Sequence, residues 1–162
     1  MDSINLTRPG QQMIMFLDGV YEINDPTGQS VYNNLRTLFT EEYITENLNK
    51  SLIWETNLNG LITITFPLSV DRSISLGRSF FPSQLPNLFA LLGAIYTFYS
   101  EELTEEKLND MNHPPFGRML MMMLRGKRDI FESMNSPLIY FSRLIKDGSA
   151  PGFYSIKLIR GS

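Results

Sequence analysis

Alternation of hydrophobic and polar residues marks three stretches of the first half of the chain and predicts β-strands there. Residues 13–23 place an Asp-Gly pair at 18–19 between two runs of strand-forming residues, which is a strong hairpin signal. A second hairpin is expected over residues 52–68, around the Asn-Gly pair at 59–60. Residues 73–81 continue the alternation, so the second hairpin and this stretch predict a three-stranded antiparallel meander.

Helical spacing of apolar residues replaces alternation in two segments. Residues 31–48 have the pattern of an amphipathic helix. From Pro86 the period is again helical, and the most apolar run extends from Leu88 to Tyr99. A bilayer-crossing helix needs about 20 residues, and this run is too short. We therefore expect a core helix and no transmembrane segment.

Proline and glycine punctuate the last third of the chain. Residues 101–110 either prolong the core helix or form a short polar helix after Thr104, and a further helix should begin near Pro115. Another helix is bounded by Ser136 as N-cap and Gly148 just beyond its end. A final strand is expected over residues 153–159. The order of elements predicts one α+β domain over residues 1–162: an N-terminal hairpin and antiparallel meander, three to four helices following, and a C-terminal strand.

Composition agrees with one folded domain of intracellular type. The chain has 162 residues, 43% hydrophobic and 19% charged, which is sufficient for a single core. Cysteine is absent, which excludes disulfides, thiolate metal sites and cysteine nucleophiles. The start, Met1 to Asn5, lacks the basic and apolar stretches of a secretory signal. We expect a cytoplasmic protein.

Candidates for catalysis are few. His113, the single histidine, has Asp110 nearby and could act as a general base, but the sequence favours a loop histidine between two helices. Adjacent glutamates such as Glu41 and Glu42 do not face each other on a helix, so they favour a solvated surface over a catalytic or metal-binding pair. We predict no catalytic residues, no metal and no cofactor.

Charge is distributed unevenly along the chain. Residues 1–110 contain six basic and 14 acidic side chains, whereas residues 111–162 contain eight basic and three acidic ones. This asymmetry fits an anionic partner for the basic part, or head-to-tail association of the acidic part of one copy with the basic part of another. Local neutralisation between the two parts of one chain explains it as well.

A methionine-rich run at 119–124 lies in the helix expected after Pro115. The run is apolar around the whole helix, which is typical of a buried helix. The alternative is that its flexible thioethers contact a partner or a second copy. The residues predicted to make such a contact are Met119, Met121 and Met122.

Basic residues in the second half form the other candidate surface. Gly126 could end the helix and bring its basic neighbours together in a turn, where they could contact phosphates or anionic lipid headgroups. The overall pI near 5.2 is low for a nucleic-acid-binding protein. The candidate anion-contact residues are Arg118, Arg125, Lys127, Arg128, Arg143 and Lys146.

These observations favour a non-catalytic interaction or assembly protein that self-associates or docks on a protein partner. A small viral or phage structural or host-interaction protein would have such a size and composition. The second hypothesis is a binder of nucleic acid or of an anionic membrane surface through the basic residues. A hydrolase that uses His113 is the third.

Overall fold

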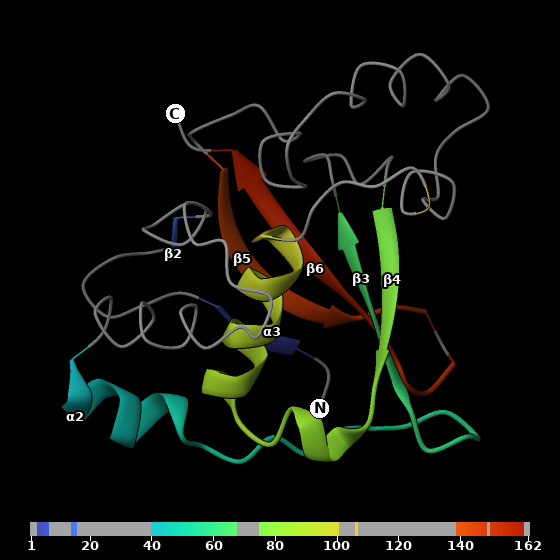
Figure 1. The fold of residues 1–162 in the computed structure, drawn as a ribbon, viewed down its shortest axis with the longest axis horizontal. Helices are drawn as coiled ribbons and strands as arrows, with labels where there is room; N and C mark the ends of the chain where they lie inside the picture. The colour runs from blue at the N-terminus through green and yellow to red at the C-terminus, as the bar shows by residue number, and fades with distance from the viewer. Residues whose placement is uncertain are drawn as a thin grey trace.

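The computed structural model contains a mixed β-sheet with a helix packed on one face (Figure 1). It describes residues 3–6, 14–15, 40–67, 75–100, 106, 139–148 and 150–160. The strands are β1 (Ser3–Asn5), β2 (Ile14–Met15), β3 (Ile62–Pro67), β4 (Ser75–Phe80), β5 (Ile139–Lys146) and β6 (Phe153–Arg160). The helical elements are α2 (Glu41–Tyr43), the π-helical turn η1 (Ile44–Leu48), the 3-10 turn η2 (Pro82–Gln84) and α3 (Leu88–Ser100).

The sheet runs in the order β1-β5-β6-β3-β4, and β2 pairs with β5 as well. Neighbouring strands are antiparallel except β3 and β6, which are parallel. The two neighbours of β3 are therefore β4 and β6. The predicted antiparallel meander is wrong, because its expected first strand lies outside the sheet and β6 takes that position beside β3.

The turn at Asn59-Gly60 is present, but the hairpin predicted around it is wrong. Asn57 Oδ1 accepts hydrogen bonds from the N–H groups of Asn59 and Leu61, and Gly60 has a φ of +74°, which favours glycine. Residues 52–56 form no strand. The Leu52 N–H instead donates to the carbonyl of Pro86 at 2.9 Å, so this arm lies along the segment before α3.

The expected helix from Ser136 to Gly148 is also wrong, because residues 139–146 form β5. β-branched and aromatic residues at its start favour a strand. The prediction relied on the helix-boundary signals of Ser136 and Gly148, which do not outweigh this strand preference. The register with β6 shifts between Phe141 and Arg143. Gly148, with a φ of +76°, belongs to the turn between β5 and β6. The strand predicted at 153–159 is confirmed as β6.

Helix α3 confirms the core helix predicted from Pro86. Asn87 Oδ1 accepts a hydrogen bond from the Ala90 N–H at 2.8 Å and so caps the helix. Near its other end, the ring of Phe98 stacks on Phe66 of β3 with the centroids 4.1 Å apart, and Arg78 of β4 lies 5.5 Å from the Phe98 centroid. The sheet face against α3 is called the inner face below, and the opposite face the outer face.

A short helix made of α2 and η1 precedes β3 in the chain. Thr40 is in an extended conformation, and its hydroxyl accepts a hydrogen bond from the Tyr43 N–H at 3.1 Å. Of the helix predicted over residues 31–48, the structure shows the part from Glu41 to Leu48, which begins after Thr40, whereas residues 31–39 lie outside the described residues. The buried Leu48 lies at the end of η1, which contacts α3.

The predicted fold class is thus wrong for the part of the chain that the structure describes. In place of a hairpin, a meander and three to four following helices, it has a mixed sheet and two short helices, α2 with η1 and α3. The helix expected after Pro115 and all of the N-terminal hairpin except β2 lie outside the described residues. Among the helices described, none is long and apolar enough to span a bilayer.

Candidate functional site

Two of the predicted anion-contact residues, Arg143 and Lys146, lie on β5. They are three residues apart, and side chains alternate along a strand, so the two point to opposite faces of the sheet. They do not form one cluster. The other candidates lie outside the described residues: Arg118, Arg125, Lys127, Arg128, Met119, Met121, Met122 and His113.

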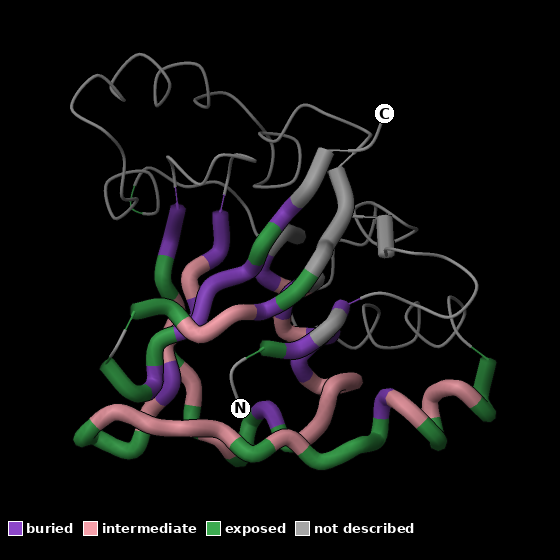
Figure 2. The backbone as a smooth tube through the Cα atoms, turned by 180° about the vertical axis from the view of Figure 1, so that it is seen from behind, coloured by how far each residue is buried: buried purple, intermediate pink, exposed green. Residues whose placement is uncertain are grey.

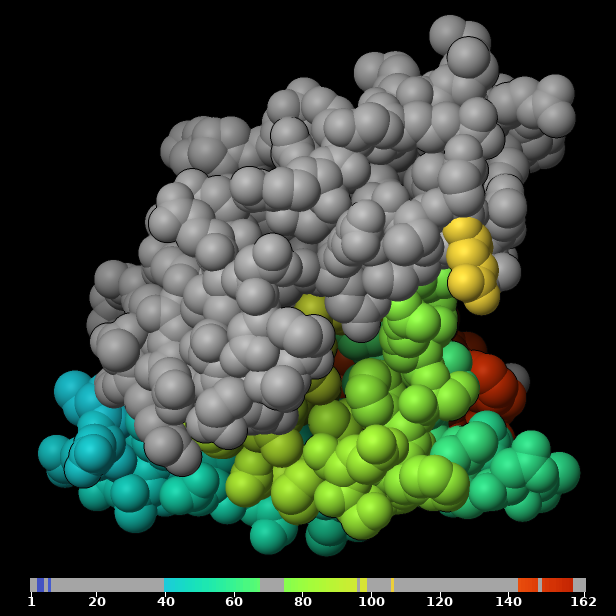
Figure 3. Space-filling model, viewed as in Figure 1, coloured from blue at the N-terminus to red at the C-terminus, as the bar shows by residue number. Residues whose placement is uncertain are grey.

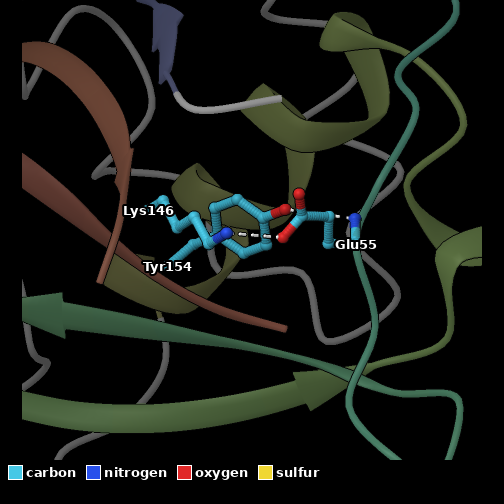
Figure 4. A network of polar contacts seen from close by, with 3 residues as sticks. All are labelled: Glu55, Lys146 and Tyr154. Carbon is cyan, nitrogen blue, oxygen red and sulfur yellow. Dashed lines mark hydrogen bonds and ion pairs between the residues drawn. The ribbon is translucent and has the colours of Figure 1, made fainter. Parts of the chain in front are cut away.

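Lys146 is engaged in an ion pair at the end of the inner face. Its Nζ lies 2.7 Å from Oε2 of Glu55, and the Glu55 N–H donates to the hydroxyl of Tyr154 at 3.2 Å (Figure 4). The hydrogen bond from Lys146, together with its positive charge, lowers the pKa of the Glu55 carboxyl. This arrangement fastens the segment around Glu55 to β5 and β6, and it gives Lys146 a structural role.

Trp54 strengthens the same attachment. Its ring meets the Tyr154 ring edge-on, with the centroids 5.0 Å apart, and its indole N–H donates to the carbonyl of Leu85 at 2.7 Å. A Cβ atom on Gly152 would lie 2.4 Å from the backbone nitrogen of Asn57, so the two backbones approach closely at this point. The segment 54–57 is therefore a fixed part of the sheet's end.

Arg143 lies on the outer face, opposite Lys157 of β6. The two residues are register partners in the antiparallel pair of β5 and β6, and both side chains are exposed. Sequence reasoning missed Lys157. The alternation of side chains in β6 could have identified it, because Phe153 and Lys157 are exposed, whereas Tyr154, Ile156 and Leu158 are buried; Ser155, on the face of Lys157, is buried as well.

A second group of exposed apolar side chains lies on the segment before β3 and on the one after β4. Leu58 is fully exposed at the turn before β3, Ile53 is 82% exposed, and Phe81 is 58% exposed just after β4. Hydrogen bonds from Leu52 to Pro86 and from Trp54 to Leu85 join the two segments that carry them. Figure 3 shows these segments side by side at the bottom of the molecule. Ile53, Leu58 and Phe81 are called the apolar edge below.

In the described ranges, no three acidic or histidine side chains come close enough together to hold a metal ion. Comparison with protein-family models, with curated proteins and with solved structures finds no match to this chain.

Proposed function

We propose that this chain is a non-catalytic assembly protein of the cytoplasm that self-associates through the apolar edge. The observation that carries the proposal is the exposure of three large apolar side chains, Ile53, Leu58 and Phe81, on two segments joined by hydrogen bonds. Single exposed apolar residues are ordinary on a protein surface, whereas a group of them is typical of an interface.

The chemistry of the chain supports a binding role. The chain has one histidine and no cysteine, so it is poor in general bases and nucleophiles. Glu55 and Lys146 are used to hold the end of the sheet together. Stable interfaces bury about 800 Å² per partner, and three side chains cover only part of that area. The association is therefore expected to be weak and to depend on protein concentration.

The test is the solution mass by light scattering over a range of protein concentration, at low and at high salt. We expect a mass above that of the 18.6 kDa monomer at high concentration, and because the contact is apolar the mass should not fall with salt. The triple variant Ile53→Ser, Leu58→Ser, Phe81→Ser should remain monomeric.

The matched control is the double variant Glu41→Ser, Glu46→Ser, which changes exposed acidic residues of α2 and η1 instead. It should associate like the original chain. Association that disappears at high salt or in this control would favour charge-driven head-to-tail assembly and contradict the proposal. A monomer at every concentration would also contradict it.

A further inference from the structure

The outer face of the sheet carries two positive charges directly opposite each other. Arg143 and Lys157 are register partners on β5 and β6, and both are exposed. Like charges in directly opposed positions destabilise a pair of strands. Among the described residues, the ion pair found joins Glu55 to Lys146, on the opposite side of the sheet from Arg143 and Lys157. A bound anion would relieve the repulsion between Arg143 and Lys157.

An aromatic ring lies on the same face of β6. Phe153 is in register with Thr63 of β3, whose neighbours Ile62 and Ile64 point to the inner core, so the Phe153 side chain points outward. It is 40% exposed. Lys157 is four positions further along β6, which corresponds to roughly 13 Å along a strand. Figure 2 shows the molecule from behind Figure 1, the side on which the sheet lies in front of α3.

Hydroxyl side chains flank the region between the aromatic ring and the cations. Thr63 and Thr65 of β3 are half-buried on the outer face, and the Thr63 hydroxyl lies 3.2 Å from the Ser79 hydroxyl of β4. Cations that contact phosphates, combined with an aromatic ring that stacks on bases, are the elements of single-strand recognition on a sheet surface.

We propose that the outer face binds single-stranded nucleic acid along β6, with phosphates at Arg143 and Lys157 and a base stacked on Phe153. A duplex keeps its bases stacked on one another and would leave the phenyl ring unused. A second copy placed across a twofold axis would bring the same positive charges together. The proposal rests on residues other than the apolar edge, although the turn that carries Leu58 lies against Gly152, the residue before Phe153.

The probe is a fluorescein-labelled oligothymidylate of about 12 nucleotides, which is within the site sizes of single-strand binders. Its anisotropy is measured against the full chain at several salt concentrations. The net charge of −3 opposes attraction, so we expect a dissociation constant on the order of 10 µM at low salt. Two phosphate contacts predict a slope of about −1.4 for log affinity against log salt.

Two single substitutions separate the roles of charge and ring. Lys157→Gln should reduce the salt slope to about −0.7, because one phosphate contact is lost. Phe153→Ser should weaken binding about tenfold and leave the slope unchanged, because stacking releases no counterions. Lys50→Gln removes an exposed lysine that lies after η1, away from the sheet, and should change neither quantity. Thermal unfolding of each variant checks that it is folded.

Several outcomes would overturn the proposal. One is the absence of an anisotropy change with the original chain at low salt up to about 100 µM protein, the weak limit of non-specific binding. Equal affinity for a duplex of the same length would remove the role of Phe153. Competition by polyglutamate as strong as competition by unlabelled oligothymidylate would indicate an acidic protein as the occupant. Equal loss of affinity in Lys50→Gln and Lys157→Gln would show general charge attraction only.

Discussion

Along β3, the side chains that point to the inner face are fully buried, whereas the threonines between them are only half-buried. Ile62, Ile64 and Phe66 pack under α3, while Thr63 and Thr65 belong to the outer face. The same division holds in β6, where Tyr154 is buried and Lys157 is exposed. The inner face of the sheet is therefore part of the core, whereas the outer face carries the exposed side chains, although its small residues Ser75 and Ser155 are buried. The predictions below test this division.

The largest effect is expected from Phe66→Ala on the inner face. Phe66 is fully buried and stacks on Phe98, so its loss should lower the free energy of unfolding by about 4 kcal/mol. Its neighbour Thr65 points to the outer face, and Thr65→Ala should cost less than about 1 kcal/mol. Urea unfolding of both variants gives the comparison. Equal decreases in the free energy of unfolding would show that the two faces of β3 are packed alike.

A smaller effect should appear at the turn where the segment before β3 closes against the end of the sheet. Gly152 has a φ of +89°, and a Cβ there would also meet the Asn57 nitrogen at 2.4 Å. Gly152→Ala should therefore lower the free energy of unfolding by about 3 kcal/mol, the sum of backbone strain and overlap.

The matched control for Gly152→Ala is Gly148→Ala in the same turn. Gly148 also has a positive φ, but a Cβ would meet nothing within 4 Å, so only the strain of about 1 kcal/mol is expected. Urea unfolding again measures both variants. If the free energy of unfolding falls by the same amount in both variants, the close approach of the Asn57 backbone does not affect stability.

The smallest effect should be a gain in stability on the outer face. Lys157→Glu replaces the repulsion with Arg143 by an attraction across the strands, which should raise the free energy of unfolding by a few tenths of a kcal/mol. The gain should shrink at high salt, because exposed charges are screened. Lys50→Glu, the control, should not show it. A loss of stability in Lys157→Glu would mean that the lysine is already paired.

Local patterns in the sequence were sufficient for several elements. Strand β3 and helix α3 follow from their periodicity, and β6 follows from its alternation. Strand β5 was not predicted, because Ser136 and Gly148 resemble the boundaries of a helix, and Gly148 belongs instead to the turn after the strand. The parallel pairing of β3 with β6 could not be predicted, because it joins segments far apart in the chain and leaves no local signal.

The candidate site was predicted only in part. Arg143 was identified as an anion contact, and the structure leaves it exposed. Lys146 was expected to act together with Arg143. Residues three apart share one side of a helix, but this segment is a strand, so Arg143 and Lys146 point to opposite faces of the sheet. Lys157 was missed, because its position opposite Arg143 depends on the register between β5 and β6. Charge counts along the sequence contain no such information.

The position of β6 beside β3 has a consequence for the newly made chain. β3 is complete at Pro67, but its parallel neighbour begins only at Phe153. At about 5–20 residues per second, the ribosome needs roughly 4–17 s to make the chain between them. During that time the backbone groups along one edge of β3 have no strand to pair with, and its three inner-face apolar side chains are not yet covered by β6. This edge can therefore pair with strands of other nascent chains. Production of this protein in cells should therefore depend on how well chaperones shield that edge until the chain is released.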